Sequence, residues 1–135
     1  MDWESHRESL IIWAEQNHYH VNLVKNGDDA VCWISKIIEI NSSKSMETQV
    51  IRLAHECGHV LIFKNGSVID FREKQSASNK TVSYKVYTVI EEVEAWKRGR
   101  ELVRRLAIPI DDSRWEKDMV SALKKYINWA SDLKK

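Results

Sequence analysis

The run from Met46 to Phe63, METQVIRLAHECGHVLIF, constrains the fold more than any other part of the chain. Its apolar residues recur at helical spacing, which predicts one helix with a broad side facing the core. His55 and His59 project together from the opposite side, and Glu56 stands beside them. Cys57 points away from the histidines, which makes it a small core residue and not a ligand. The predicted core side consists of Met46, Val50, Leu53, Ala54, Cys57, Val60 and Leu61.

The three polar residues form the pattern His-Glu-x-x-His, for which two interpretations compete. On an exposed helix, such histidines are solvated side chains without a special function. In an apolar run, burying two histidines and a glutamate without partners costs several kcal/mol. Imidazoles four residues apart on a helix reach one ion, and the offset of one residue lets Glu56 act as general base on water. We therefore predict a metal site with His55 and His59 as ligands and Zn²⁺ as the ion.

A third protein ligand must come from outside this helix. Histidines occur only at positions 6, 18, 20, 55 and 59, so none follows the motif. His18 or His20 is one source, although both lie at the entry to a strand. The other source is IEEVEAW on a later helix, where Glu92 projects into the apolar side, Glu91 lies at its edge and Glu94 outside it. An inward carboxylate is costly unless it is paired or binds metal, so we predict Glu92 as the ligand and Glu94 as its main competitor.

Small residues predict close contact between the two helices. Gly58 flanks His55 on the first helix. Ala95 and Gly99 follow Glu92 by one and two turns on the second. Side chains of this size let neighbouring backbones approach, so the later helix should press against the motif helix.

Residues that start or stop helices indicate where the remaining helices lie. Residues 1–17 predict an amphipathic helix that Asp2 starts. A long helix runs over 82–107 and ends at IPI, because proline forbids its continuation. Ser113, with Glu116 three residues later, resembles a capping box that opens a last helix.

Strands are predicted between the first two helices. Residues 20–34 contain two β-rich runs around Asn26-Gly27, a strong hairpin signal. Residues 36–41 predict a third strand, and the polar stretch 64–80 predicts a long loop with a short strand, a candidate rim or lid. The fold class is therefore α+β: a helix, a short antiparallel or mixed sheet, and three helices.

The composition of the chain indicates its number of domains, its classes of partner and its location. The 135 residues are 43% hydrophobic and 30% charged, typical of one globular domain over residues 1–135. The formal net charge of +1 points to neither nucleic acid nor a membrane surface. No apolar run reaches the roughly 18 residues of a membrane span, and MDWESHRESL is too polar for a secretion signal. Two cysteines, Cys32 and Cys57, do not suggest a disulfide framework, so we predict a reducing, cytoplasmic location.

The motif followed by a glutamate on a later helix resembles the gluzincin class of zinc peptidases. Within that class the chain is most similar to the ImmA/IrrE family of small bacterial and phage metallopeptidases, through VIRLAHECGHVLI and EVEAWKRG. The resemblance covers roughly residues 46–107 and implies a zincin-like domain. It assigns the two motif histidines and Glu92 as zinc ligands and the motif glutamate as general base. Trp96 stands where the family usually has asparagine.

The resemblance also implies a protein or peptide substrate, such as a repressor of a mobile element. The residues themselves indicate amide hydrolysis, in which the motif glutamate takes a proton from water and passes it to the leaving amine. An exposed edge strand at 36–41 would align a peptide by β-augmentation. Candidate donors to the oxyanion are Tyr84, Tyr87, His18 and His20, for which ordinary packing is the alternative.

Two other classes of function compete with a peptidase. A non-catalytic zincin-fold binding or inhibitor module would keep the fold, but such a module has no use for Glu56. Nucleic-acid binding would use the basic side of the 82–107 helix, but neighbouring acidic residues weaken the positive field of this side. A solvated helix face is the simpler interpretation, so we expect no nucleic-acid partner. The basic residues are Lys97, Arg98, Arg100, Arg104 and Arg105.

Overall fold

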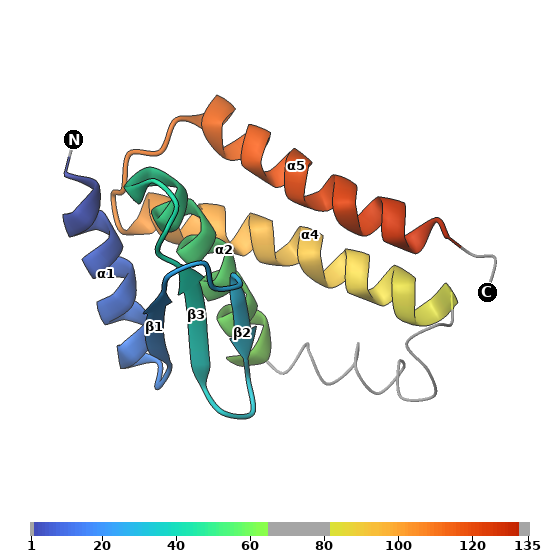
Figure 1. The fold of residues 1–135 in the computed structure, drawn as a ribbon, viewed down its shortest axis with the longest axis horizontal. Coiled ribbons are helices and arrows are strands. Elements are labelled where there is room, and N and C mark those ends of the chain that lie inside the picture. Colours follow the sequence, from blue (N-terminus) through green and yellow to red (C-terminus); the bar gives the residue numbers. More distant parts are fainter. Residues whose placement is uncertain (1, 65–81, 133–135) are drawn as a thin grey trace.

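The computed structural model describes residues 2–64 and 82–132 of the chain. In this part the order is one helix, a three-stranded mixed sheet and three helices, which confirms the predicted α+β class (Figure 1). Among the described helices, none combines the length and apolar character that a membrane span requires. The predicted rim or lid lies outside the described residues. The elements are α1 (Trp3–Gln16), β1 (His20–Val24), β2 (Ala30–Cys32), β3 (Ile37–Asn41), α2 (Met46–Lys64), α4 (Val82–Arg105) and α5 (Asp112–Ala130).

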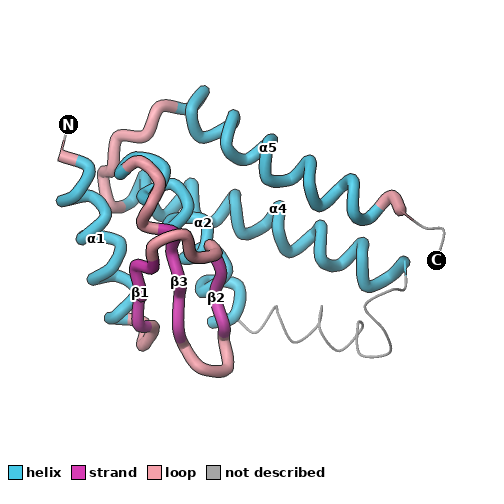
Figure 2. Tube along the Cα trace, viewed as in Figure 1, coloured by secondary structure: helices cyan, strands magenta, loops and turns pink. Residues whose placement is uncertain are grey.

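The sheet corrects two predictions about the strands. β3 lies between the other strands, parallel to β1 and antiparallel to β2 (Figure 2). A turn forms at the predicted position, where the Gly27 N–H donates to the Val24 carbonyl over 3.0 Å. The strands on either side of this turn do not pair with each other, so the predicted hairpin is wrong. The strand predicted at 36–41 is central and not an edge, and within residues 2–64 and 82–132 the edges of the sheet are β1 and β2.

Hydrogen bonds from the loop between β1 and β2 explain this order. The Asp28 N–H donates to Glu39 Oε2 over 2.8 Å, and the Asn41 N–H donates to Asp29 Oδ1 over 2.8 Å. These bonds tie the loop to β3 and place β2 on the far side of β3 from β1. In the resulting register the fully buried Ile38 lies opposite a valine of each neighbouring strand.

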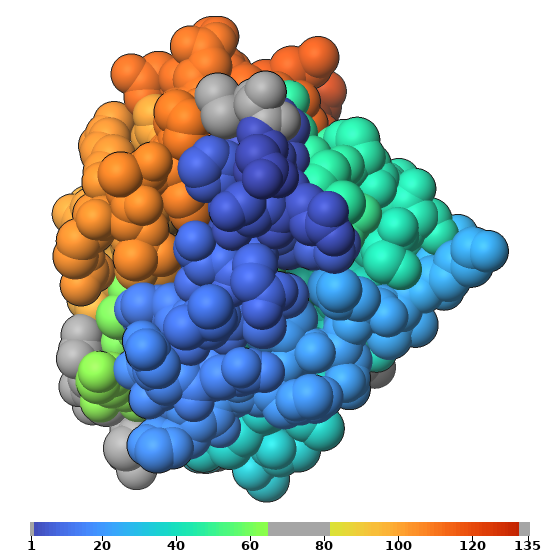
Figure 3. Space-filling view, turned by 90° about the vertical axis from the view of Figure 1, so that its left-hand side faces the viewer, coloured from blue at the N-terminus to red at the C-terminus, as the bar shows by residue number. Residues whose placement is uncertain are grey.

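Helix α1 begins at its predicted cap and closes one side of the core. The Asp2 side chain accepts a hydrogen bond from the Ser5 N–H over 3.1 Å, which satisfies one of the free donors of the first turn. Leu10 and Ala14 are fully buried on its inner side. Figure 3 looks onto this face, where α1 lies between the strand region and the segment joining α4 to α5.

Helix α2 is buried on more sides than its apolar pattern predicts. Every residue from 53 to 60 is buried, including the polar motif residues. Leu61 was expected in the core but is partly exposed, while Ile62 is fully buried in a small cluster with Ala95 of α4. The helix is covered by α1, by the strands and, most extensively, by α4. The motif residues therefore lie inside the molecule.

Helix α5 returns antiparallel to α4 and partly covers it (Figure 1). The predicted capping box at its start is wrong. The helix begins at Asp112 with Asp111 at the N-cap position, and no side chain caps it. Ser113 Oγ instead donates to Asp111 Oδ2 over 2.6 Å, because Ser113 already lies within the first turn.

The two cysteines lie in different surroundings and form no disulfide. Cys57 is fully buried in the main core cluster, as predicted, and burial raises the pKa of its thiol. Cys32 is exposed at the end of β2, where hydrogen bonds with Ser35 lower the pKa of its thiol.

Candidate metal centre

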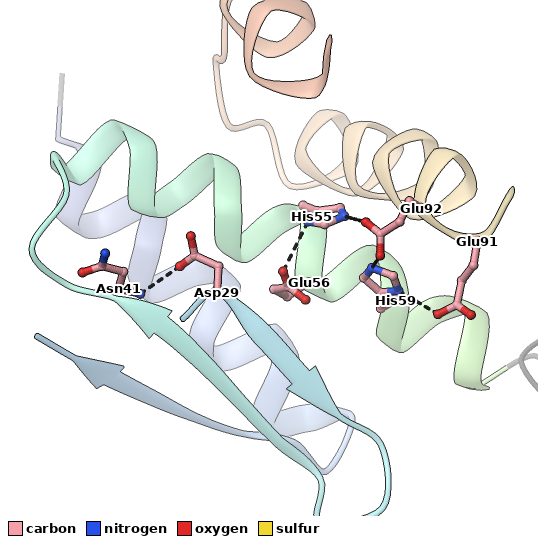
Figure 4. A network of polar contacts seen from close by, with 7 residues as sticks. All are labelled: Asp29, Asn41, His55, Glu56, His59, Glu91 and Glu92. Carbon is pink, nitrogen blue, oxygen red and sulfur yellow. Dashed lines mark hydrogen bonds and ion pairs between the residues drawn. The ribbon is translucent and has the colours of Figure 1, made fainter. Parts of the chain in front are cut away.

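The polar motif residues of α2 form one buried cluster (Figure 4). His55, Glu56 and His59 are 8%, 4% and 5% exposed. One potential ligand atom from each residue lies within 4.8 Å of the others, so the three can hold a metal ion. The imidazole centroids are 4.9 Å apart, as expected for residues one helical turn apart.

Helix α4 brings a carboxylate against both imidazoles (Figure 4). Glu92 Oε1 lies 3.0 Å from His55 Nε2, and Glu92 Oε2 lies 3.1 Å from His59 Nε2. The predicted inward direction of Glu92 is therefore confirmed. The predicted competitor, Glu94, instead accepts a hydrogen bond from Arg98 Nε over 2.8 Å, one turn along the same helix.

Glu91 makes a contact that the sequence did not predict. Although it was placed at the edge of the apolar side, it is only 6% exposed, and its Oε2 lies 3.1 Å from His59 Nδ1. On the other ring, Glu56 Oε2 lies 3.3 Å from His55 Nδ1. A neutral imidazole carries one N–H, and these carboxylates favour that proton on Nδ1. With the proton on Nδ1, each Nε2 atom, which here contacts Glu92, offers its lone pair to a metal on that side.

Glycines set the distance between the two helices. A Cβ added to Gly58 would lie 2.0 Å from the Ala95 carbonyl oxygen of α4. A Cβ added to Gly99 would lie 2.6 Å from the Ala54 carbonyl oxygen of α2. Only glycine fits at either position, so the predicted close backbone contact is confirmed. The contact lies one to two turns from Glu92 and so fixes how far its carboxylate reaches.

The imidazoles and carboxylates shift each other's pKa values. Burial alone would lower the pKa of His59, but hydrogen bonds with Glu91 and Glu92 outweigh it and raise the pKa to about 10. Burial likewise lowers the pKa of His55, and Glu56 and Glu92 reverse the effect. For Glu92 burial raises the pKa, but the two histidines lower it to about 2. Because a metal binds unprotonated imidazole, metal binding would release protons from this cluster.

Trp96 forms the wall behind His55. The two rings stack with centroids 4.3 Å apart and planes inclined by 15°. Trp115 of α5 packs edge-on against Trp96 at 5.2 Å. The Trp96 ring is fully buried, and its Nε1 has no hydrogen-bond partner in the described part of the chain. Packing, and not a hydrogen bond, therefore holds this side of His55.

The cluster lies in a cleft of about 350 Å³. Residues Asp29–Val31, at the start of the edge strand β2, line it, as do Lys125 and Tyr126 of α5. Arg52, one turn before the motif on α2, also lines the cleft. Such a cleft, with polar groups converging at its base, can admit a peptide segment to the cluster.

Of the tyrosines and histidines proposed as oxyanion donors, only some line the cleft. Tyr84 lines it, whereas Tyr87, His18 and His20 are not among its described lining residues. Tyr126 was missed: it lines the cleft together with Glu92, and burial followed by the charges of nearby carboxylates raises the pKa of its phenol. Tyr126 recurs with Met119 and Ala122 at helical spacing on the last helix, and nothing in its local sequence indicates that it lies near the motif.

Comparisons with known proteins were made by family, by sequence and by structure. No protein-family model, curated protein or solved structure matches the chain. The resemblance to the ImmA/IrrE family therefore stays a prediction. Function must be argued from the geometry of the cluster and its cleft.

Proposed function

We propose that this chain is a zinc metallopeptidase of the gluzincin type, similar to the ImmA/IrrE family, that hydrolyses peptide bonds of a protein substrate. The observation that carries the proposal is Glu92 shared between the Nε2 atoms of His55 and His59, with Glu56 in the same cleft. Ligation by two imidazoles and a carboxylate leaves an open position for catalysis. The substrate class that the resemblance suggests is a cytoplasmic regulatory protein, such as a repressor of a mobile element.

The donor set fits zinc. Zinc in catalytic sites takes imidazole nitrogen and carboxylate oxygen at about 2.0–2.2 Å, so two ligand atoms of one ion lie at most roughly 4.4 Å apart. The Glu92 contacts of 3.0 and 3.1 Å, one from each of its oxygens, lie within this limit. Among the described residues, the group whose ligand atoms all lie within 4.8 Å of one another is His55, Glu56 and His59, without Glu92. Glu56 also belongs to the cluster, but it contacts Nδ1 of His55, across the ring from Nε2. We therefore assign Glu92 as the third ligand and leave Glu56 for proton transfer.

Each residue of the site then has its own role in hydrolysis. Zinc, when bound, supplies the Lewis acidity that brings the pKa of water towards neutrality and polarises an amide carbonyl. Glu56 takes the proton of the attacking water on its carboxylate and delivers it to the leaving amine. Glu91 holds the proton on Nδ1 of His59. Tyr126, whose phenol stays protonated at neutral pH, is placed to donate a hydrogen bond to the oxyanion.

The edge strand β2 gives the substrate backbone a place to bind. An extended peptide can add to an exposed sheet edge through main-chain hydrogen bonds. The strand at 36–41 cannot serve, because it has a neighbour on both sides. In the described part of the chain β2 is an edge, and it lines the cleft. Methylating the backbone nitrogens of a cleaved peptide one at a time should slow cleavage at alternate positions near the scissile bond. Equal cleavage of every methylated peptide would refute this placement.

The decisive experiment separates catalysis from metal binding. Zinc content and peptide cleavage are measured for the wild type, for Glu56→Gln and for His59→Ala. We expect Glu56→Gln to retain zinc and lose cleavage, and His59→Ala to lose both. Glu94→Gln, which alters the carboxylate paired with Arg98, is the matched control and should keep both. A Glu56→Gln protein with undiminished biological effect would instead indicate a binding module on a zincin-like fold.

Little in the structure favours a nucleic-acid partner. The basic side of α4 is partly neutralised by acidic neighbours: Arg98 pairs with Glu94, and both Arg100 and Arg104 pair with Asp112. Lys97 and Arg105, the other basic residues of this side, are exposed, and we propose that they are solvated. Salt-insensitive or absent binding to DNA would agree with this interpretation.

A further inference from the structure

Arg52 differs from the other partly buried arginines in having no partner. Its Nε is buried and makes no hydrogen bond, and the described part of the chain offers Arg52 no ion pair. A buried donor without a partner is unfavourable, more so when it belongs to a charged group. The other partly buried arginines described each donate to a side chain: Arg7 to Gln49, Arg98 to Glu94, Arg100 to Asp112 and Arg114 to Glu47.

The position of Arg52 directs this free guanidinium into the cleft. Arg52 precedes His55 by three residues and Glu56 by four on α2, so all three lie on one side of the helix. All three line the same cleft. Although Glu56 is within reach by helical spacing, the two residues form no ion pair, and Glu56 contacts His55 instead. The guanidinium is therefore available to a molecule that enters beside the catalytic carboxylate.

We propose that Arg52 determines substrate specificity by binding a carboxylate of the peptide, either an acidic side chain close to the scissile bond or a free C-terminal carboxylate. The proposal rests on the proposed function, because it takes a peptide to be the occupant of the cleft. The planar fork of a guanidinium suits a carboxylate in two parallel hydrogen bonds. One helical turn separates Arg52 from the motif, which limits the recognised residue to the immediate neighbourhood of the cleaved bond.

The other charged residues of the cleft also favour the binding of an anionic ligand beside Arg52. Lys125 of α5 is exposed on the lining and adds a second cation. The acidic lining residues already have partners: Asp29 accepts the Asn41 N–H, and Glu91 and Glu92 contact the histidines. Arg52 is thus a partly buried charge of the described cleft that still lacks a counterion.

Binding can be tested without turnover in zinc-loaded Glu56→Gln protein. Three pools of random-sequence peptides are compared by fluorescence anisotropy. The first contains Asp and Glu and has amidated C-termini; the second replaces them by Asn and Gln; the third is the second with free C-termini. We expect the first or the third pool to bind about ten- to a hundredfold more tightly than the second. The pool that gains affinity identifies the source of the carboxylate.

Variants at Arg52 test whether this residue causes the preference for peptides that carry a carboxylate. In the Glu56→Gln protein, a second substitution, Arg52→Met, should abolish this preference. Arg52→Lys should retain part of the preference, since lysine keeps the charge but not the planar fork of donors. Arg105→Met removes an exposed arginine that is not among the cleft residues and should leave the preference unchanged. Zinc content and circular dichroism confirm that each variant is folded. Equal affinity of all pools, or a preference that survives Arg52→Met, would overturn the proposal.

Cleavage by the enzyme with Glu56 intact separates this inference from the proposed function. If neutral and acidic peptides are cut equally well and Arg52→Met changes neither, the peptidase proposal stands and the specificity proposal fails. If Arg52→Met lowers kcat equally for both, Arg52 acts on the oxyanion, and the specificity proposal fails. If no peptide is cut while acidic pools bind through Arg52, the recognition stands and the peptidase proposal fails.

Discussion

Replacing Gly58 by alanine should separate the two helices that carry the candidate metal centre. The added Cβ would lie 2.0 Å from the Ala95 carbonyl oxygen, and a Cβ contact under 3.0 Å essentially never occurs. Since the obstacle is backbone, α4 must move away by about 1 Å to restore even the shortest normal contact. Glu92 lies one turn from Ala95 on the same side, so its contacts of 3.0 and 3.1 Å with the histidines would open by a similar amount.

Two effects of opposite sign decide the stability of this variant. An alanine in place of glycine within a helix normally stabilises by roughly 1 kcal/mol. Overpacking a tight contact destabilises by about 1–3 kcal/mol, and here the clash is with backbone, which cannot rotate away. We therefore expect Gly58→Ala to lower the free energy of unfolding and to weaken zinc binding at least about tenfold, as loss of an orienting contact does. Urea unfolding and competition with a chelating dye measure the two quantities.

Gly99→Ala provides a graded comparison. Its Cβ would lie 2.6 Å from the Ala54 carbonyl oxygen, so a movement of only about 0.4 Å restores the same contact. Its effects on stability and zinc affinity should have the same sign as those of Gly58→Ala but be smaller. If Gly58→Ala is more stable than the wild type and binds zinc equally well, the helices do not control the position of Glu92.

Three further predictions follow from the site. Glu91→Gln should weaken zinc binding about ten- to a hundredfold, because a neutral amide orients His59 less well, while Glu94→Gln should not; dye competition checks both. Tyr126→Phe should lower kcat with little change in KM or zinc content, and an unchanged kcat would remove Tyr126 from catalysis. In protein freed of zinc by a chelator, the raised pKa of His59 stabilises the fold below its ordinary value of 6.5, and this is lost as pH rises towards about 10. The lowered pKa of Glu92 stabilises above 4.5 and is lost as pH falls towards about 2, so urea midpoints should decline on both sides.

Helical periodicity predicted the elements that carry the candidate metal centre. The ends of α2 and α4 lie within a few residues of their predicted positions, and the inward direction of Glu92 follows from the angle between successive residues. These features are local, because a helix makes its backbone hydrogen bonds within one segment. The sequence also predicted the close packing at Gly58, since small residues recur where the helices meet.

The features that were missed depend on contacts between distant segments. The signal at Asn26-Gly27 predicts a turn, but it cannot say which strand will lie beside β1, and hydrogen bonds to β3 decide that. Glu91 is buried because α2 comes close enough to cover the edge of α4. Tyr126 shares the cleft with Glu92 only because α5 returns antiparallel along α4 (Figure 1). No spacing rule relates these residues to the motif, so a single sequence does not reveal them.

The two thiols differ in exposure and in pKa, so the native protein can be labelled at one cysteine only. Thiolate is the species that reacts with maleimide, and a buried thiol with a raised pKa supplies almost none at neutral pH. Cys32 is exposed and its pKa is lowered, so a fluorophore would attach there while Cys57 stays unmodified. The dye would stand one residue beyond Val31, on the strand that borders the cleft. Successive side chains of a strand point to opposite faces, so the dye would lie across the sheet from Val31. A change in its emission on adding a peptide would show that binding in the cleft alters the surroundings of β2.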